Sequence, residues 1–325
     1  MTLHYARAPH IKSEASVSSM MRDVLFALAV LLILPTVHYG ARPLVMAGLT
    51  MLTCLFCEVL FNLIQTKNIR ITECSSMVTG LTIAMLMPLN APIWMPCMAA
   101  AFAILVAKGP FGAIGNTPFN PAAAGVAFVT LCYPQTIFAY FKPDAVSSLP
   151  AFNDCTVPLV SSSAAVLKNG LKPDIFPLNM LWGSFAGPMG TTAILIIGAC
   201  GLFLFARRTA RWEITACFLA AAALIAAFSP RFAGDALTSI KYELMSGSLF
   251  FCSVYMVTDP VTSPNTMRGR CIYGALAGAL VMVFRRFGAY EQGAVFAVLI
   301  ANAAAPLIDG MVCSALRMGG GLSEE

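Results

Sequence analysis

The feature that most constrains this chain is a series of apolar segments, most of them close to the length of a lipid bilayer. A transmembrane helix needs about 20 predominantly apolar residues, and about ten segments approach this length. They are 22–39, 43–64, 75–90, 93–108, 120–135, 190–206, 213–229, 243–258, 271–285 and 292–310. Because 58% of the residues are hydrophobic and only 11% are charged, a soluble globular protein is excluded. We expect an all-α polytopic membrane protein.

A long polar segment, 136–189, divides the apolar segments into two sets of five. An odd number of spans per half makes the halves insert in opposite orientations, as in the inverted repeats of transport proteins. The third segment is broken at Pro88 and the eighth at Pro260, at corresponding places in the two halves. The fourth and ninth segments are also expected to be short or broken. The expected parts are an N-terminal tail (1–21), a first five-helix repeat (22–135), an external loop (136–189), a second repeat (190–310) and a C-terminal tail (311–325).

Basic residues are concentrated in the loops on the side of the two termini, for example at Arg207, Arg208 and Arg211. Cytoplasmic loops of membrane proteins carry such an excess of lysine and arginine. Both termini are therefore predicted to be cytoplasmic. The loop 136–189 and the turn that follows it are then expected on the outer face.

A glycine-rich turn lies where the sixth apolar segment begins. Gly187 and Gly190 permit close approach of a ligand to the backbone, and Thr191 and Thr192 fall where the first helical turn is expected. Free N–H groups and the positive end of the helix dipole suit a phosphate there. The local sequence alone favours a turn and helix cap without a ligand.

Three carboxylates stand in or at the ends of apolar segments: Glu58, Asp259 and Asp309. Charges at membrane depth are costly and usually face a cavity, a partner or an ion path. We expect these residues to mark an ion pathway. Asp309 is explained about equally well as a helix-end carboxylate, and Asp259 as a cap or loop anchor, so Glu58 is the least easily explained as structure.

The segment from Asn116 to Pro121 follows a run of glycines. Asn120 is expected to cap a helix that starts at Pro121, a favoured first helical residue. Capping does not explain Asn116, and we expect the loop to line a ligand site. Cys54 and Cys57 form a C-x-x-C pair without a second pair or a nearby histidine, so no metal site is expected.

Several motifs along the chain resemble the RnfD/NqrB family. They are Ala8–Ile11, Asn116–Pro121, Thr258–Pro264, Gly269-Arg270, Tyr273-Gly274 and Asn302–Asp309. The resemblance covers nearly the whole chain in order, and the short N-terminal tail fits the Rnf members better. It implies a membrane subunit of an ion-translocating ferredoxin:NAD oxidoreductase in a prokaryotic plasma membrane.

The resemblance also implies the cofactors and partners. FMN would be joined through its phosphate to a threonine that corresponds to Thr192, although the adjacent Thr191 remains a rival. A noncovalent riboflavin is implied as well, with Asn116, Asn120 and Asp259 in the suggested lining. The implied partners are an external FMN flavoprotein, intramembrane iron–sulfur subunits and a cytoplasmic NADH-binding subunit, and no nucleic acid.

The resemblance implies that the chain carries electrons across the membrane and is coupled to Na⁺ or H⁺ transport, since a flavin supplies redox chemistry and the protein positions it. Two alternatives remain. The same inverted repeat would suit a channel or secondary transporter for a small polar solute, and a scaffold subunit would leave Thr192 unmodified.

Overall fold

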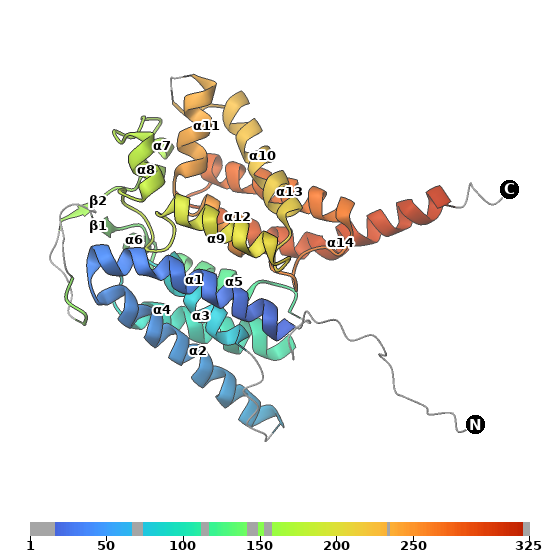
Figure 1. Cartoon of the computed structure of the whole chain (residues 1–325), viewed down its shortest axis with the longest axis horizontal. Helices are drawn as coiled ribbons and strands as arrows, with labels where there is room; N and C mark the ends of the chain where they lie inside the picture. The colour runs from blue at the N-terminus through green and yellow to red at the C-terminus, as the bar shows by residue number, and fades with distance from the viewer. Residues whose placement is uncertain are drawn as a thin grey trace.

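The computed structural model describes residues 17–66, 74–111, 117–141, 149–152, 158–232 and 235–320. These residues are almost entirely helical. The strands among them are β1 (Tyr140–Phe141) and β2 (Leu159–Val160), a short antiparallel pair. The prediction of an all-α polytopic membrane protein is therefore confirmed (Figure 1).

The first half of the chain forms α1 (Val17–Tyr39), α2 (Arg42–Thr66), α3 (Ser75–Leu86), α4 (Trp94–Phe102) and α5 (Pro121–Cys132). Helix α3 stops where Met87 takes an extended conformation, as the residue before a proline prefers. Helix α4 does not break as expected. It continues directly into the π-helical η1 (Ala103–Lys108) and the 3₁₀ turn η2 (Gly109–Phe111).

The segment between the halves contains β1, β2 and three short helices: α6 (Pro134–Ile137), α7 (Ser163–Lys168) and α8 (Pro177–Trp182). Helices α6 and α8 each begin with a proline at the first helical position, where its missing N–H costs nothing. Helix α8 ends at Gly183, whose φ of 89° is a left-handed C-cap.

The second half forms α9 (Ile194–Ala206), α10 (Trp212–Phe228), α11 (Ala236–Met245), α12 (Leu249–Tyr255), α13 (Met267–Phe287) and α14 (Ala294–Gly320). The expected span 243–258 is interrupted between α11 and α12, where Gly247 has a φ of 62°. The prediction that the ninth segment is short or broken is wrong, because α13 is a continuous helix of 21 residues. Helix α14 extends into the expected C-terminal tail.

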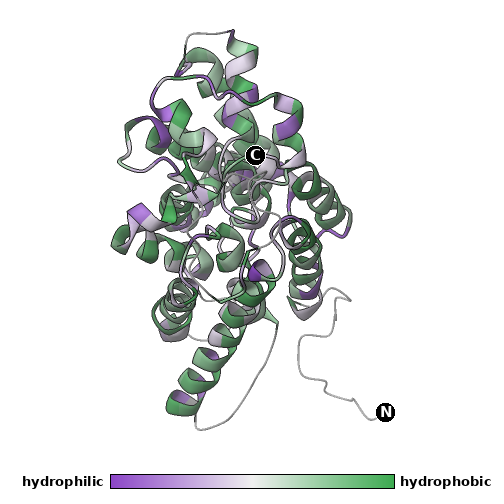
Figure 2. Ribbon diagram, turned by 90° about the vertical axis from the view of Figure 1, so that its left-hand side faces the viewer, coloured by the Kyte–Doolittle hydropathy of each residue, from purple (hydrophilic) through white to green (hydrophobic). Residues whose placement is uncertain are grey.

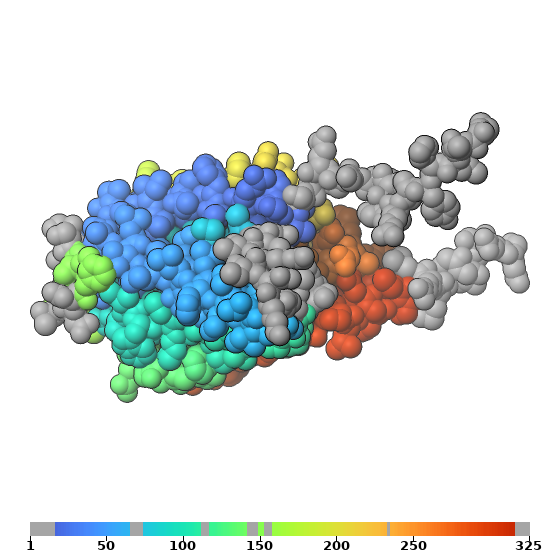
Figure 3. Space-filling model, turned by 90° about the horizontal axis from the view of Figure 1, so that it is seen from below, coloured from blue at the N-terminus to red at the C-terminus, as the bar shows by residue number. Residues whose placement is uncertain are grey.

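The same helix neighbours recur in the two halves, which supports a five-helix repeat. Helix α1 packs on α3 as α9 packs on α12, and α2 packs on α4 as α10 packs on α13. Likewise α4 contacts α5 as α13 contacts α14, and α3 contacts α5 as α12 contacts α14. The halves meet where α1 packs on α9 and α5 packs on α14. Figure 3 shows the face formed by α1, α2 and the α4–α5 region, with α14 in red at one end.

Five helices among the described residues are long and apolar enough to cross a membrane, and four more are apolar but shorter. The shorter ones are α3, α5, α9 and α10. Large apolar side chains point outward, for example Phe56, Ile64 and Phe228, which are 67%, 75% and 87% exposed. Apolar residues also dominate the ribbons in Figure 2. A lipid environment removes the cost of exposing such side chains.

The two terminal helices place their outer ends on one side of the molecule. In Figure 1, α1 begins and α14 ends toward the right, whereas β1, β2, α7 and α8 lie toward the left. The orientation of the two termini relative to the membrane stays a prediction.

A buried charge cluster fixes α11 against α13. Glu243 is 1% exposed and pairs with Arg231 and Arg285. The fully buried Arg285 also donates to the Ser246 carbonyl oxygen at 2.6 Å. Burying charges is tolerated here because each is paired and hydrogen-bonded.

Candidate functional site

The glycine-rich turn before α9 lies against the broken end of α3. The Gly190 N–H donates to the Met85 carbonyl oxygen at 2.8 Å, and the Met189 N–H donates to the Met87 carbonyl oxygen at 3.1 Å. A Cβ at Gly190 would lie 2.4 Å from Met85 Sδ. Glycine is therefore required at this position by the close approach of α3.

The two threonines of this turn have different surroundings. Thr191 is completely buried, and its hydroxyl donates to the Pro188 carbonyl oxygen at 3.2 Å. Thr192 is partly exposed. A Cβ at Gly187 would lie 3.2 Å from Thr192 Cγ2, and a Cβ at Gly183 would lie 3.2 Å from the Thr192 carbonyl oxygen. The backbone at both glycines therefore packs closely against Thr192.

The prediction that Thr191 and Thr192 open a helix is wrong. Helix α9 begins at Ile194, and its N-cap, Ala193, makes no side-chain cap. The Thr191 N–H donates to the Pro188 carbonyl oxygen at 3.1 Å, within the turn. The Gly190 N–H donates to the Met85 carbonyl oxygen of α3. These backbone donors are therefore not free for an anion, and the threonines belong to a packed turn that precedes the helix.

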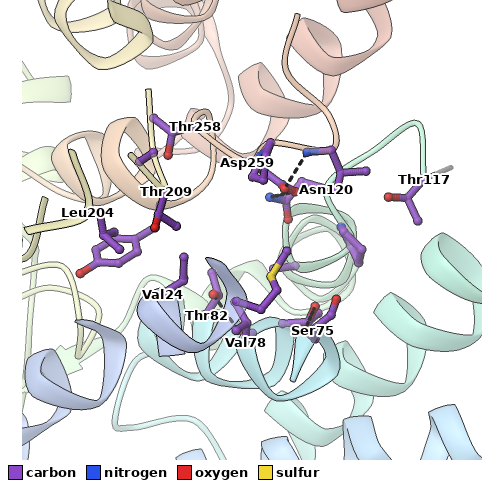
Figure 4. Close-up of a pocket in the computed structure, with 18 of the residues that line it drawn as sticks. Val24, Ser75, Val78, Thr82, Thr117, Asn120, Leu204, Thr209, Thr258 and Asp259 are labelled. Atoms are coloured by element: carbon purple, nitrogen blue, oxygen red, sulfur yellow. Dashed lines mark hydrogen bonds between the residues drawn. The ribbon is translucent and has the colours of Figure 1, made fainter. Parts of the chain in front are cut away.

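At the other end of α3, a polar hollow lies between the two halves. Its polar lining includes Ser75, Thr79, Thr82, Lys108, Asn120 and Asp259. In Figure 4, Asp259 and Asn120 lie on one side, across from Ser75, Val78 and Thr82 of α3. The hollow has a volume of about 80 Å³. This volume is smaller than a three-ring heterocycle, so such a ligand would require the hollow to widen.

Asn120 and Asp259 meet in this hollow although 139 residues separate them. The Asn120 side-chain oxygen accepts from the Ala123 N–H at 3.2 Å, so its predicted capping of α5 is confirmed. Its Nδ2 donates to Asp259 Oδ2 and to the Met256 carbonyl oxygen, both at 3.4 Å. Asn116 lies outside the described residues.

Asp259 lies in the loop between α12 and α13, outside the membrane-spanning helices. Burial raises the pKa of this carboxyl to about 6, against the opposing effect of the Val261 N–H that donates to it. Desolvation disfavours the charged form. The hollow therefore contains a carboxyl that titrates close to neutral pH.

Glu58 does not stand alone in its apolar helix. Lys108 Nζ lies 2.9 Å from Glu58 Oε1 and 2.7 Å from Ser76 Oγ, and both charged side chains are largely buried. The sequence analysis did not identify Lys108 as the partner of Glu58, because a lysine at the end of an apolar segment was treated as a basic loop residue. The two partners are 50 residues apart, so the local sequence gives no sign of the pairing beyond the position of Lys108 at that end.

Asp309 has a different environment from the other two carboxylates. It accepts hydrogen bonds from the Asn265 N–H at 2.9 Å, the Thr266 N–H at 3.3 Å and the Thr266 hydroxyl at 2.8 Å. These contacts anchor the loop that leads into α13. Asp309 is not among the described residues that line the hollow, and its role in an ion pathway stays a prediction.

Metal-ligating side chains do not gather in the described part of the chain, where no group of three or more histidine, cysteine, aspartate or glutamate residues could hold an ion. The expectation of no metal site stays a prediction, because part of the chain is outside this description.

Helix α3 links the turn to the hollow. Thr82 lines the hollow, and Met85, three residues further along the same helix, accepts the hydrogen bond from Gly190. Three residues of helix rise by about 4.5 Å. The two candidate sites are therefore close neighbours along α3.

Comparison with known proteins decides the family. The family described as NQR2, RnfD, RnfE matches residues 4–316. The chain belongs to this family. It is 30% identical to the D subunit of the ion-translocating oxidoreductase complex of Escherichia coli O7:K1 (strain IAI39 / ExPEC), over 95% of this chain and 96% of that protein. The same figures hold for the protein of that name from Salmonella arizonae (strain ATCC BAA-731 / CDC346-86 / RSK2980).

The resemblance drawn from the sequence motifs is confirmed by this family match. The match to the two relatives covers 95% of this chain. Together with the apolar helices, it establishes a multi-pass membrane protein.

Proposed function

We propose that this chain is the D-type membrane subunit of an ion-translocating electron-transfer complex and carries FMN, joined through its phosphate to the Thr192 hydroxyl. The observation that carries this proposal is the contrast between the two adjacent threonines. Thr192 is partly exposed, whereas Thr191 is fully buried and its hydroxyl is hydrogen-bonded within the turn. A flavin transferase needs an accessible hydroxyl to form a phosphoester.

The turn around Thr192 is held in a fixed position. The N–H groups of Met189 and Gly190 donate to carbonyl oxygens at the end of α3, and the Thr191 hydroxyl donates to Pro188 within the turn. Bound FMN would supply the electron chemistry, and the protein would position it. The turn would hold the phosphate end in a fixed place relative to α3.

The hollow is the proposed site of a second, noncovalent flavin, riboflavin. Asn120, Asp259 and the hydroxyls of α3 offer hydrogen-bonding groups to the edge of a flat ring, and Tyr255 is an aromatic wall residue. The cavity volume of about 80 Å³ is below the usual range of ligand pockets, about 300–1,000 Å³. The hollow would therefore have to widen to admit the ring system. Its position on α3 would place this flavin near the first.

The relatives, each named as the D subunit of an ion-translocating oxidoreductase complex, support the same assignment. Electrons would pass between an external FMN flavoprotein, the two flavins, intramembrane iron–sulfur subunits and a cytoplasmic NADH-binding subunit in a ferredoxin:NAD oxidoreductase. Coupling to Na⁺ or H⁺ would involve Glu58, Asp259 and Asp309. Both termini would lie in the cytoplasm of a prokaryotic cell, with Thr192 on the outer face.

A solute channel or secondary transporter is the second candidate. Secondary transporters bind solutes at the interface of two repeats, beside interrupted helices. The hollow lies between the two halves and is bordered by the loop in which α12 ends, with Thr258, Asp259 and Pro260. This alternative does not require a modified threonine, so the state of Thr192 separates the two functions.

In-gel flavin fluorescence tests the proposal. The chain is co-expressed with its complex and a flavin transferase, denatured and separated by electrophoresis. Fluorescence is expected in the wild type and in Thr191→Val, and is expected to be absent in Thr192→Val. Removing the Thr192 hydroxyl should cost about 1 kcal/mol of stability or less, so the variant should still fold. A dark wild-type band would favour the transporter.

A further inference from the structure

A second cavity lies between α11 and the segment that leads into α8. It has a volume of about 380 Å³, within the usual range of ligand pockets, about 300–1,000 Å³. One wall is the stretch 172–177, and the other consists of Thr238, Lys241 and Tyr242 of α11. Helices α7, α8 and α11 lie together in the upper part of Figure 1. The cavity shares no described lining residue with the hollow, so it is a separate site.

The two walls of this cavity are joined through Tyr242. The Tyr242 hydroxyl donates to the Ile175 carbonyl oxygen at 2.9 Å. The Lys172 ammonium group lies 5.7 Å from the centre of the Tyr242 ring, in cation–π contact. Tyr242 is buried and belongs to a small apolar core with Phe185 and Phe232. The chain therefore holds the walls at a fixed separation without a ligand.

The cavity carries an excess of positive charge. Its charged lining residues are Lys172 and Lys241, on opposite walls, and Asp174. Two lysines against one aspartate leave one net positive charge. The ion pairs of the described residues include neither lysine, so both ammonium groups can pair with a ligand. The Thr238 hydroxyl adds a further donor. A singly charged anion with several acceptor oxygens, such as a phosphodiester, matches this set.

Large apolar side chains stand on or next to the lining residues. Phe176 lines the cavity and is 77% exposed, and Leu178 and Trp182 of α8 are 69% and 67% exposed. Leu237, which precedes Thr238 on α11, is also exposed. Exposed apolar groups that gather in this way mark contact with a membrane or a protein. Tryptophan is enriched where a protein surface meets the lipid headgroups.

The position of the cavity in the fold favours a membrane over a protein partner. Helix α10 is one of the shorter apolar helices and ends at Phe228, which is 87% exposed. Helix α11 packs on α10, so the exposed apolar side chains of α11 and α8 continue the lipid-facing surface past the end of α10. Lysines at this level can keep their stems on apolar surface and their ammonium groups among the headgroups.

We propose that this cavity binds the headgroup of an anionic phospholipid. The phosphodiester would lie between the ammonium groups of Lys172 and Lys241, with the Thr238 hydroxyl as a further donor. The acyl chains would lie along Phe176 and Leu178. The lipid would tether α8 to α11 at the membrane surface. This site does not depend on a flavin at Thr192 or in the hollow.

Quenching of Trp182 by brominated lipid tests the site in the full-length chain, reconstituted in nanodiscs. The chain has three tryptophans, so Trp94→Phe and Trp212→Phe leave Trp182 as the single fluorophore. The discs consist of phosphatidylcholine with an added lipid that carries bromine on its acyl chains, either phosphatidylglycerol or phosphatidylcholine. Brominated phosphatidylglycerol should quench Trp182 more than brominated phosphatidylcholine at the same mole fraction. This excess measures the enrichment of the anionic lipid beside α8.

Charge variants assign the excess to the cavity. Lys172→Gln/Lys241→Gln should abolish it. Each basic residue at a membrane surface strengthens association with anionic lipid about fivefold. For Lys241→Gln alone, the mole fraction of phosphatidylglycerol that gives half of the excess should therefore rise about fivefold. Asp174→Asn removes a like charge and should increase the excess. The matched control is Arg208→Gln/Arg211→Gln, which removes two exposed charges between α9 and α10 and should keep the wild-type excess.

Three results would overturn the lipid site. An equal loss of the excess in the control pair would assign it to the overall charge of the protein. A wild-type Trp182 that neither brominated lipid quenches would show that α8 is out of reach of the bilayer, as expected for a protein-binding face. Inorganic phosphate should leave the excess unchanged, because the acyl chains hold the lipid at the surface. Removal of the excess by phosphate would identify a site for a free anion.

Discussion

At the residue scale, the turn before α9 shows how packing separates two neighbouring threonines of identical chemistry. The Thr191 hydroxyl satisfies the Pro188 carbonyl oxygen inside the turn, and the Thr192 side chain reaches the surface. Both positions depend on Gly190, whose backbone touches α3. The side chain at residue 190 therefore governs the accessibility of the proposed attachment site.

Gly190→Ala tests this dependence. The added Cβ would lie 2.4 Å from Met85 Sδ and 2.5 Å from Met85 Cβ, and such overpacking typically costs about 1–3 kcal/mol. Thermal unfolding of the detergent-solubilised protein should show the loss. Gly48→Ala in α2 is the control, because a Cβ at this position would have nothing within 4 Å. It should be neutral or stabilising by up to about 1 kcal/mol. Equal stability of the two variants would contradict the contact with α3.

Glu243→Gln tests the buried charge cluster. Removing one partner of a buried ion pair leaves uncompensated charge and typically costs about 3–5 kcal/mol, here at Arg231 and Arg285. Asp23→Asn removes a carboxylate whose charged partner, Arg207, is 55% exposed, so a much smaller loss of stability is expected. Chemical denaturation in detergent measures both. A loss for Glu243→Gln as small as that for Asp23→Asn would show that the cluster is not critical.

At the scale of elements, helix starts that depend on neighbouring residues could be predicted from the sequence. Contacts between residues far apart in the sequence could not. The start of α5 follows from Asn120 and Pro121 alone. The start of α9 does not follow from its own sequence, because carbonyl groups of Met85 and Met87 hold the preceding turn. The pairing of Glu58 with Lys108 was invisible for the same reason, since it depends on how α2 meets η1.

The length of α13 gives a second example. Its first turn is capped by Thr266, whose hydroxyl accepts from the Gly269 N–H at 3.2 Å, and Asp309 of α14 holds Thr266 in place. Apolarity alone indicated only 271–285, because the first turn contains Arg268 and Arg270. The helix begins at Met267 since a tertiary contact positions its cap.

Gly278→Val tests the contact between α10 and α13. Gly274 and Gly278 are four residues apart on α13, and Cβ atoms there would lie 2.5 Å from the Ile214 carbonyl oxygen and 2.3 Å from that of Phe218. Small residues at this spacing let membrane helices approach closely, so overpacking should cost at least about 1–3 kcal/mol. Gly310→Ala in α14, with nothing within 4 Å, should leave the melting temperature unchanged. An equally stable Gly278→Val would refute close packing.

At the scale of the whole molecule, the proposed electron path requires the segment between the two halves to lie on the outer face of the membrane. With Cys132, Cys155 and Cys313 replaced by serine, a cysteine is introduced at Leu171 or at Arg211, both exposed positions. An impermeant maleimide applied to intact cells should label residue 171 and not residue 211. The reverse pattern would place the turn before α9 in the cytoplasm and contradict the proposed electron path.

The most direct test of the central claim is the intact mass of the purified chain after co-expression with the flavin transferase. The account predicts that the wild type and Thr191→Val gain the mass of FMN minus one water, and that Thr192→Val gains nothing. An unmodified wild-type chain, or an adduct that persists in Thr192→Val, would contradict it.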